Sequence, residues 1–131
     1  MIRVELERRV GRHTIEMKVE SVGADLLVVV YGGDEHHIGG IAVAYPTKSH
    51  YREAITVSVS TLTLPGHKDY IVANSTAERL CKSLGRTAVV SVGIHMENAT
   101  AREIQMAVDA VDAMTDDAIA HLQKESQTKS I

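Results

Sequence analysis

Polar and apolar residues alternate over the first part of the chain with the period of two that half-buried β-strands show. The alternation covers residues 2–7 and 14–22, and Gly11-Arg12 lies between them, so we predict a two-stranded hairpin. Residues 25–31 are instead almost continuously apolar, which is typical of a strand buried on both faces. The pattern therefore predicts three strands at the N-terminal end.

Three more strands and a first helix are predicted further along. Strands are expected over residues 38–45, where Pro46 ends the run, and over residues 54–64 and 87–96. Between the last two strands the pattern changes, because apolar residues within 69–84 recur at helical spacing. A strand, a helix and a strand thus follow one another in this part of the chain.

Local signals mark the ends of both predicted helices. Gly85 follows the first helix at the position where a helix-ending glycine belongs. Thr100 and Glu103 have the spacing of a capping box, which opens a second helix that we expect to run to about Lys124. Cys81 falls on the apolar face of the first helix, so we interpret it as a small buried hydrophobe.

The whole pattern predicts one α+β domain over residues 1–125 and a polar tail, residues 126–131, that frays. The 131 residues carry a net charge of −3 and include neither Trp nor Phe, which argues against a nucleic-acid-binding surface. We find no signal-peptide pattern and no apolar run long enough to span a membrane. With a lone cysteine, these features predict a cytoplasmic protein.

Three polar segments, each directly after an apolar run, carry histidines and carboxylates: residues 33–40, 65–69 and 93–98. Imidazole and carboxylate groups are the side chains that bind divalent metal ions and move protons near neutral pH. We therefore predict a site for a divalent metal ion whose identity the sequence leaves open. Its predicted ligands are His36, His37, His67, Asp69, His95 and Glu97.

Whether these segments meet depends on strand direction. If the third predicted strand runs up, the fourth runs down and the fifth runs up. Parallel pairing of the sixth strand with the fifth, after a helical crossover, makes the sixth run up as well. The carboxyl ends of strands three, five and six then share one edge of the sheet. Because helices begin just after the second and third segments, this edge suits an anionic group such as phosphate.

The same residues also have structural interpretations. Asp69 is placed to cap the helix that follows it. Gly39-Gly40 permits a close approach of backbones, and Lys68 either pairs with phosphate or is solvated. His95 and Glu97 can be a surface pair, although their spacing on an extended strand would point both to the same side. We also interpret His13, His50 and His121 as surface residues.

Three motifs carry a family resemblance. They are Gly32-Gly33 with His37-Ile38-Gly39, Leu64-Pro65-Gly66-His67-Lys68-Asp69, and Gly93-Ile94-His95-Met96-Glu97-Asn98-Ala99-Thr100. Over about residues 2–124 the chain resembles the LpdD-like family of bacteria and archaea, whose members are known as D subunits of gallate-type decarboxylases and as prenylated-flavin chaperones. The resemblance implies a fold like that of proteasome-assembly chaperones: a six-stranded, mainly antiparallel sheet with two helices, in a homodimer.

The resemblance also implies a function. It suggests a non-catalytic partner of UbiD-like decarboxylases that holds reduced prenylated FMN and passes it to the apoenzyme. We expect the phosphate to be held through the metal ion, and the scarcity of aromatic residues predicts a shallow or dimer-shared groove for the ring. The residues expected to contact the flavin are His37, Gly39, Lys68, Asn98 and Thr100.

Two other functions are compatible with the same residues. One is a metal-dependent phosphoester hydrolase with Glu35 or Glu97 as its base, which alone predicts turnover of generic phosphoesters. The other is an assembly chaperone without a ligand, for which joint replacement of His67 and His95 would have no consequence. The chain has no HExxH, paired CxxC or P-loop motif, so spacing alone does not name a reaction.

Overall fold

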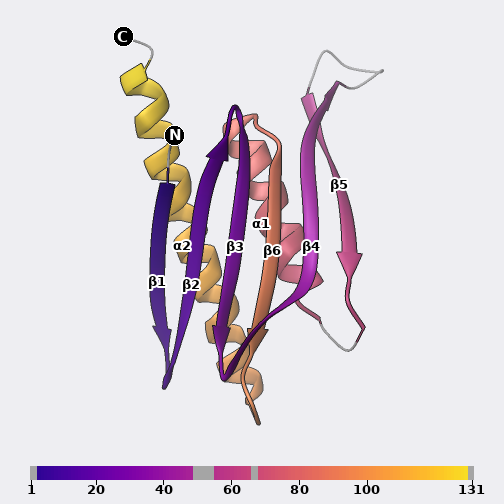
Figure 1. Cartoon of the computed structure of the whole chain (residues 1–131), viewed down its shortest axis with the longest axis vertical. Coiled ribbons are helices and arrows are strands. Elements are labelled where there is room, and N and C mark those ends of the chain that lie inside the picture. The colour runs from indigo at the N-terminus through magenta and orange to yellow at the C-terminus, as the bar shows by residue number, and fades with distance from the viewer. Residues whose placement is uncertain (1–2, 49–54, 66–67, 130–131) are drawn as a thin grey trace.

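The described part of the chain, residues 3–48, 55–65 and 68–129 of a computed structural model, forms one six-stranded sheet with two helices (Figure 1). The strands are β1 (Arg3–Val10), β2 (His13–Val22), β3 (Asp25–Gly33), β4 (Glu35–Lys48), β5 (Ile55–Thr63) and β6 (Ala88–His95). The helices are α1 (Tyr70–Leu84) and α2 (Ala101–Lys129). The predicted α+β class with its six strands and two helices is confirmed.

The strand order, β1-β2-β3-β6-β4-β5, differs from the prediction in one respect. β6 does not pair with β5; it lies between β3, to which it is parallel, and β4, to which it is antiparallel. The valine-rich β6 thereby gains a hydrogen-bonding partner on each side, as a buried central strand requires. All other neighbouring pairs are antiparallel, so the sheet is mainly antiparallel, as expected.

Strand β4 and helix α2 are among the elements that extend further than predicted. β4 continues through Pro46, which pairs with Val57 of β5. Proline is tolerated there because pairing with β6 ends at Ala44, so beyond that residue β4 has a free edge. Helix α2 runs to Lys129 rather than to about Lys124, since most residues after Leu122 are Gln, Lys or Glu, which are good helix formers.

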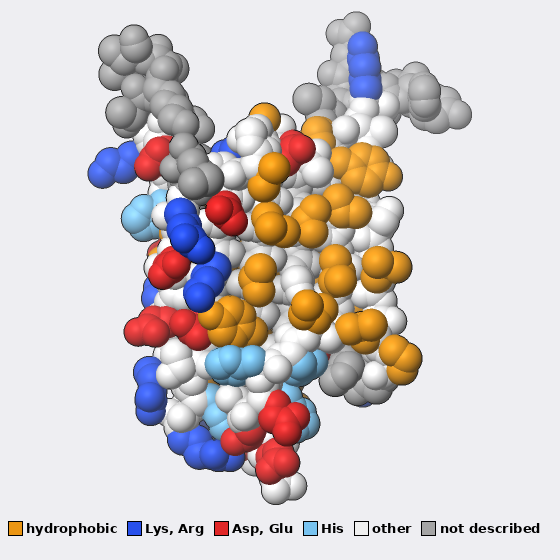
Figure 2. All heavy atoms as spheres, in the orientation of Figure 1, with side chains coloured by type: hydrophobic (Ala, Val, Ile, Leu, Met, Phe, Trp, Pro, Cys, Tyr) orange, Lys and Arg blue, Asp and Glu red, His pale blue; other side chains and the backbone are white. Residues whose placement is uncertain are grey.

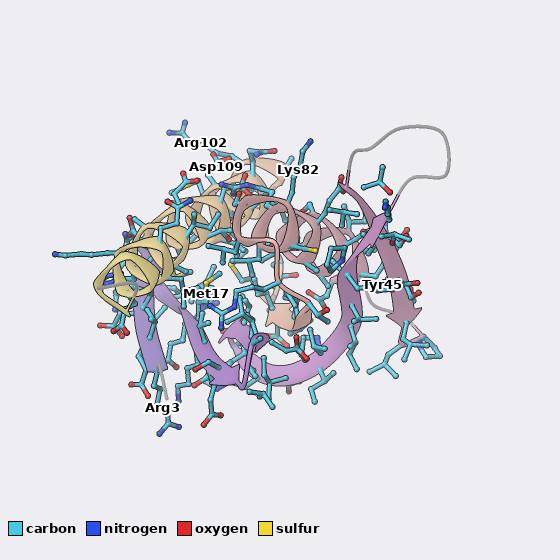
Figure 3. The ribbon with its side chains drawn as sticks, turned by 90° about the horizontal axis from the view of Figure 1, so that it is seen from above. Arg3, Met17, Tyr45, Lys82, Arg102 and Asp109 are labelled. Atoms are coloured by element: carbon cyan, nitrogen blue, oxygen red, sulfur yellow. The ribbon has the colours of Figure 1, made fainter. Side chains whose placement is uncertain are left out.

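The core lies between the two helices and one face of the sheet. Seen from above, the sheet curves around the helices, and Met17 points into the space between the layers (Figure 3). Cys81 is buried there, which confirms its predicted role, and burial raises the pKa of its thiol. The largest fully buried side chains include those of Ile15, Met17, Leu26, Leu80, Met114 and Leu122.

The described helices include no segment with the length and apolar character needed to cross a bilayer.

Neither of the two described helices covers the opposite face of the sheet. On this face, strands β1 and β2 carry charged side chains of both signs, whereas strands β3, β6, β4 and β5 carry mainly apolar side chains (Figure 2). We name this apolar side the open-face patch. It consists of Leu27, Val29, Tyr31, Val89, Ile41, Val43, Tyr45 and Leu62.

Candidate functional site

The three histidine-bearing segments meet at the end of the sheet where β3 and β6 finish side by side. Gly33 of β3 lies opposite His95 of β6, and the N–H of Asp34 donates to the carbonyl of His95 over 2.7 Å. The chain then crosses the end of β6 to begin β4 on its other side. The expected convergence is therefore confirmed, but its cause is the pairing of β6 with β3 and β4 rather than with β5.

A glycine lets β4 cross β6 so closely. The β4–β6 register shifts between His36 and Gly40, and within this bulge the carbonyl oxygen of His37 would lie 1.6 Å from a Cβ atom on Gly93. Only a residue without a side chain fits beneath that carbonyl. Gly93 thus permits the local path that positions His37.

The amino-terminal end of α1 is seated on the same bulge. A Cβ atom on Gly40 would lie 2.4 Å from the backbone nitrogen of Tyr70, and one on Gly39 would lie 2.0 Å from Oδ2 of Asp69. The predicted role of Gly39-Gly40 in close backbone approach is confirmed. The helix therefore delivers Asp69 directly to the β4–β6 crossing.

The carboxylate of Asp69 does not cap α1. Although Asp69 occupies the N-cap position, its side chain makes no capping hydrogen bond. Instead Oδ1 accepts the N–H of Ile94 over 3.1 Å, and Oδ2 lies 3.1 Å from Nε2 of His37. The predicted capping interaction is wrong because the end of β6 and His37 take both oxygens.

His37, Asp69 and His95 form what we call the His–Asp cluster, with one member from each segment. The ring centroids of His37 and His95 are 6.3 Å apart and nearly edge-on. The side chains of His37 and Asp69 are 20% and 12% exposed, so the pair is partly shielded from water but open to a ligand. This combination of imidazoles and a carboxylate suits a divalent cation or an anionic group bridged by one.

A second polar contact ties the loops around the cluster together. Oδ2 of Asp34 accepts the N–H of Glu97 over 2.7 Å, while Oδ1 lies 3.1 Å from Arg12. His13, interpreted from sequence as a surface residue, is buried, and its Nε2 lies 3.6 Å from Asp34. Position 13 alternates in step with the buried positions 15, 17 and 19 of β2, so the pattern already indicated a buried side chain. The surface interpretation relied instead on the polar character of histidine.

Donation from Glu97 N–H lowers the pKa of Asp34 below its usual value, and the charges of Arg12 and His13 contribute in the same direction. A lowered carboxyl pKa adds stability above the unfolded-state pKa of about 4, and this stability is lost as the pH falls through the folded-state pKa. Acid should therefore release the loop contact that Asp34 makes.

We predict that Asp34→Asn flattens the acid dependence of stability. Between about pH 4 and pH 2 the free energy of unfolding of the variant should fall less steeply than that of the wild type, because the carboxamide does not titrate. Urea unfolding at stepped pH measures this. Asp25→Asn, at the exposed start of β3, is the control and should retain the wild-type slope. Equal slopes for Asp34→Asn and the wild type would contradict the prediction.

Two of the other predicted ligands, His36 and Glu97, are described and lie in the segments around the cluster. The His36 ring contacts the Tyr31 ring, with centroids 4.9 Å apart, and so adjoins the open-face patch. Glu97 lies in the turn after β6 ends at His95, so the strand alternation that paired it with His95 does not extend to it. His67 lies outside the described residues, as does His50, while His121 is exposed as predicted.

The residues predicted to contact flavin differ in their exposure and in their hydrogen bonds. Lys68 is exposed just before α1, and Asn98 adopts a left-handed backbone, with φ of 54°, in the turn before α2. Thr100 is engaged in the predicted capping box: its hydroxyl accepts the N–H of Glu103, and a Glu103 oxygen accepts the N–H of Thr100, both over 3.1 Å. Donation from the N–H of Thr100, and from its hydroxyl, to the Glu103 carboxylate lowers the pKa of Glu103.

The His–Asp cluster fits part of a metal site. Two atoms bound to one ion at about 2.1 Å lie about 3.0–3.4 Å apart, and the 3.1 Å between His37 Nε2 and Asp69 Oδ2 meets this condition. Two imidazoles on one ion have centroids about 5 Å apart, so His95 would have to move closer. In the described ranges no three His, Cys, Asp or Glu side chains are arranged to hold an ion.

Comparison with known proteins identifies the family. The family described as "Prenylated flavin chaperone LpdD-like domain" matches residues 9–123, nearly the whole chain. The chain belongs to this family. It is also 30% identical over 105 residues to Protein LpdD of Lactiplantibacillus plantarum (strain ATCC BAA-793 / NCIMB 8826 / WCFS1), an alignment that covers 80% of this chain and 74% of that protein. The predicted resemblance to the LpdD-like family is confirmed, and membership of a chaperone family indicates an accessory, non-catalytic role.

A solved structure shares the fold. A chain in the crystal structure of a novel chaperone complex for yeast 20S proteasome assembly superimposes with a TM-score of 0.51 at 15% identity, covering 95% of this chain and 98% of that one. At this identity the likeness concerns the fold alone. It confirms the expected similarity to proteasome-assembly chaperones.

Proposed function

We propose that this chain is a non-catalytic, cytoplasmic carrier that binds reduced prenylated FMN and delivers it to a UbiD-like decarboxylase. The observation that carries the proposal is the placement of Asp69. Its carboxylate joins α1, the end of β6 and His37 at one point instead of capping its own helix. A family of prenylated-flavin chaperones supplies the class of ligand.

The His–Asp cluster is the proposed phosphate grip, by which we mean the site that binds the flavin phosphate through a divalent ion. Asp69 and His37 would hold the ion, with His95 and, from outside the described residues, His67 as further donors. When bound, the ion would neutralise negative charge on the phosphate, and the flavin would remain exchangeable. Lys68, exposed beside Asp69, would add a second positive charge for the same phosphate.

Binding measurements under anaerobic conditions test this function. Purified protein is titrated with reduced prenylated FMN and with reduced FMN, each with Mn²⁺ and with EDTA. We expect preferential binding of the prenylated form that EDTA abolishes, followed by activation of an apo-decarboxylase when the loaded protein is added. Failure to bind either flavin with Mn²⁺ present would contradict the proposal and favour a chaperone without a ligand. Turnover of p-nitrophenyl phosphate would favour the hydrolase.

The open-face patch is the proposed interface of a homodimer. It spans four strands without a charged side chain, whereas the flanking β1 and β2 carry both signs. A two-fold axis through the patch would bury apolar surface against its own copy and leave the charged strands in water. His36 and Tyr31 border both regions, so each His–Asp cluster would lie near the dimer interface.

We predict that Val43→Lys in the middle of this patch yields a monomer, because an interface of this kind does not tolerate an unpaired buried ammonium group. Sedimentation velocity at micromolar concentration measures the state. The control is Glu5→Lys on β1, which adds the same side chain on the same face away from the patch and should leave the dimer intact. A monomeric wild type, or a dimeric Val43→Lys variant, would contradict the proposed interface.

A further inference from the structure

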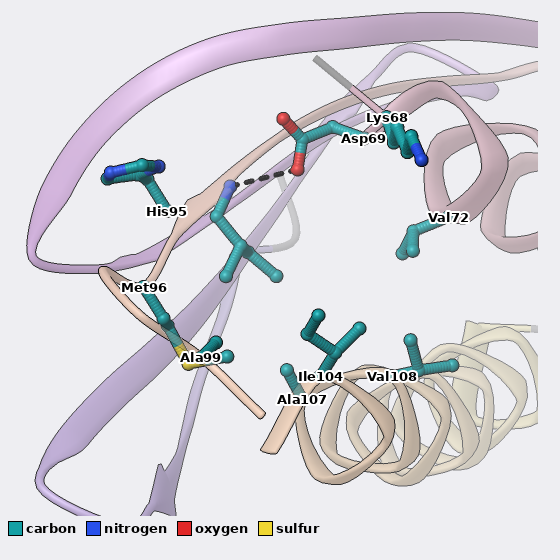
Figure 4. A pocket seen from close by; sticks show the side chains of 10 residues that line it. Lys68, Asp69, Val72, His95, Met96, Ala99, Ile104, Ala107 and Val108 are labelled. Atoms are coloured by element: carbon teal, nitrogen blue, oxygen red, sulfur yellow. Dashed lines mark hydrogen bonds between the residues drawn. The ribbon is translucent and has the colours of Figure 1, made fainter. Parts of the chain in front are cut away.

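A pocket of about 290 Å³ opens beside the His–Asp cluster, between the end of β6 and the two helices (Figure 4). Val72 of α1 faces Ile104 and Val108 of α2 across it. The polar side chains among its walls come from Lys68, Asp69 and His95. The remaining walls are aliphatic or thioether groups from Val72, Ile94, Met96, Ala99, Ile104, Ala107 and Val108.

The walls favour an aliphatic guest over a flat aromatic one. None of the lining residues in the described part of the chain is Phe, Tyr or Trp, and the imidazole of His95, at the polar end, is the one aromatic ring among them. Its branched side chains and alanines instead match a compact, branched hydrocarbon group. The volume is at the lower limit for a small-molecule site, which suits one part of a ligand rather than the whole of a flavin nucleotide.

The pocket is continuous with the proposed phosphate grip, because Asp69 and His95 belong to both. From Ile104 to Val108 the α2 wall extends about 6 Å further from this shared end. A ligand with its anionic group at the cluster can therefore extend along the helices into apolar surroundings. The polar and apolar ends of the site thus correspond to the two ends of an amphiphilic ligand.

We propose that this pocket seats the prenyl-derived aliphatic ring of the flavin and is the element that distinguishes prenylated from plain FMN. The inference rests on the proposed carrier function and adds to it the source of ligand selectivity. Val72 and Val108 are the selectivity residues, since they face each other from the two helices at the apolar end.

The double variant Val72→Thr/Val108→Thr tests the assignment. Threonine keeps the β-branched shape of valine but replaces a methyl group with a hydroxyl, and both positions are half-buried, so the new hydroxyls can still reach water and folding should be retained. We expect the affinity for reduced prenylated FMN to fall about tenfold, with less than about a twofold change for reduced FMN. Val57→Thr/Val59→Thr, two half-buried valines of β5 outside the pocket, is the matched control and should keep wild-type selectivity.

A second variant, Val108→Phe, fills the pocket instead of changing its polarity and should cause the same selective loss. Circular dichroism and thermal unfolding verify that each variant is folded. Undiminished preference for the prenylated flavin in both variants would overturn the pocket assignment and leave the carrier function standing, as would an equal loss for both flavins. If the wild type binds neither flavin, the carrier function fails and the assignment fails with it.

Discussion

Replacing Asp69 with asparagine is expected to lower the affinity for reduced prenylated FMN about 100-fold while the protein stays folded. The carboxamide oxygen can still accept the N–H of Ile94, so the contact between α1 and β6 is retained. What is lost is the negative charge beside His37, which a cation at this position requires. Anaerobic titration with Mn²⁺ present measures the effect.

Two further variants separate binding from folding at this position. Asp69→Ala also removes the acceptor for Ile94 and should lower the free energy of unfolding by about 1–3 kcal/mol in addition to the loss of binding. Asp109→Asn on α2, far along the chain from the cluster and exposed, should change neither quantity appreciably. An Asp69→Asn variant that binds flavin as tightly as the wild type would rule out Asp69 as part of the grip.

Gly93→Ala is expected to produce the largest loss of stability, at least about 3 kcal/mol in the free energy of unfolding. The added methyl group would lie 1.6 Å from the carbonyl oxygen of His37 and 2.4 Å from its carbon. Both are backbone atoms, so no side-chain rotation relieves the overlap. The β4 bulge has to move, and His37 moves with it.

Urea unfolding measures this loss, and Gly23→Ala provides the comparison. Gly23 has a positive φ of 60° but open space around it, so that variant should lose only about 1 kcal/mol from backbone strain. Failure of the Gly93→Ala protein to accumulate in folded form would also agree with the prediction, as the largest possible loss of stability. Wild-type stability in Gly93→Ala would show that β4 does not cross over this residue.

Local signals in the sequence predicted the elements well. Gly85 ends α1 with a left-handed φ of 66° and an N–H donated to Cys81, as the glycine at that position indicated. The capping box of Thr100 and Glu103 is present with both reciprocal hydrogen bonds. Such features depend on residues three or four apart, and for that reason a sequence pattern can reveal them.

Long-range choices were harder to predict. The alternation in β5 and β6 is compatible with several pairings, and nothing local indicates that β6 is inserted between β3 and β4. Asp69 had an adequate local role as a helix cap, yet its carboxylate is taken by residues 25 and 32 positions away, Ile94 and His37. The meeting of the segments was predictable from strand direction, but the partner of each side chain was not.

The most direct test of the proposed phosphate grip is the ³¹P resonance of reduced prenylated FMN bound to the protein loaded with Mn²⁺. A paramagnetic ion that holds the phosphate broadens this resonance beyond detection, and protein loaded with Mg²⁺ is the diamagnetic control. We predict a broadened resonance for the wild type with Mn²⁺ and a sharp one with Mg²⁺. A sharp ³¹P line from flavin bound to the Mn²⁺-loaded wild type would contradict the account.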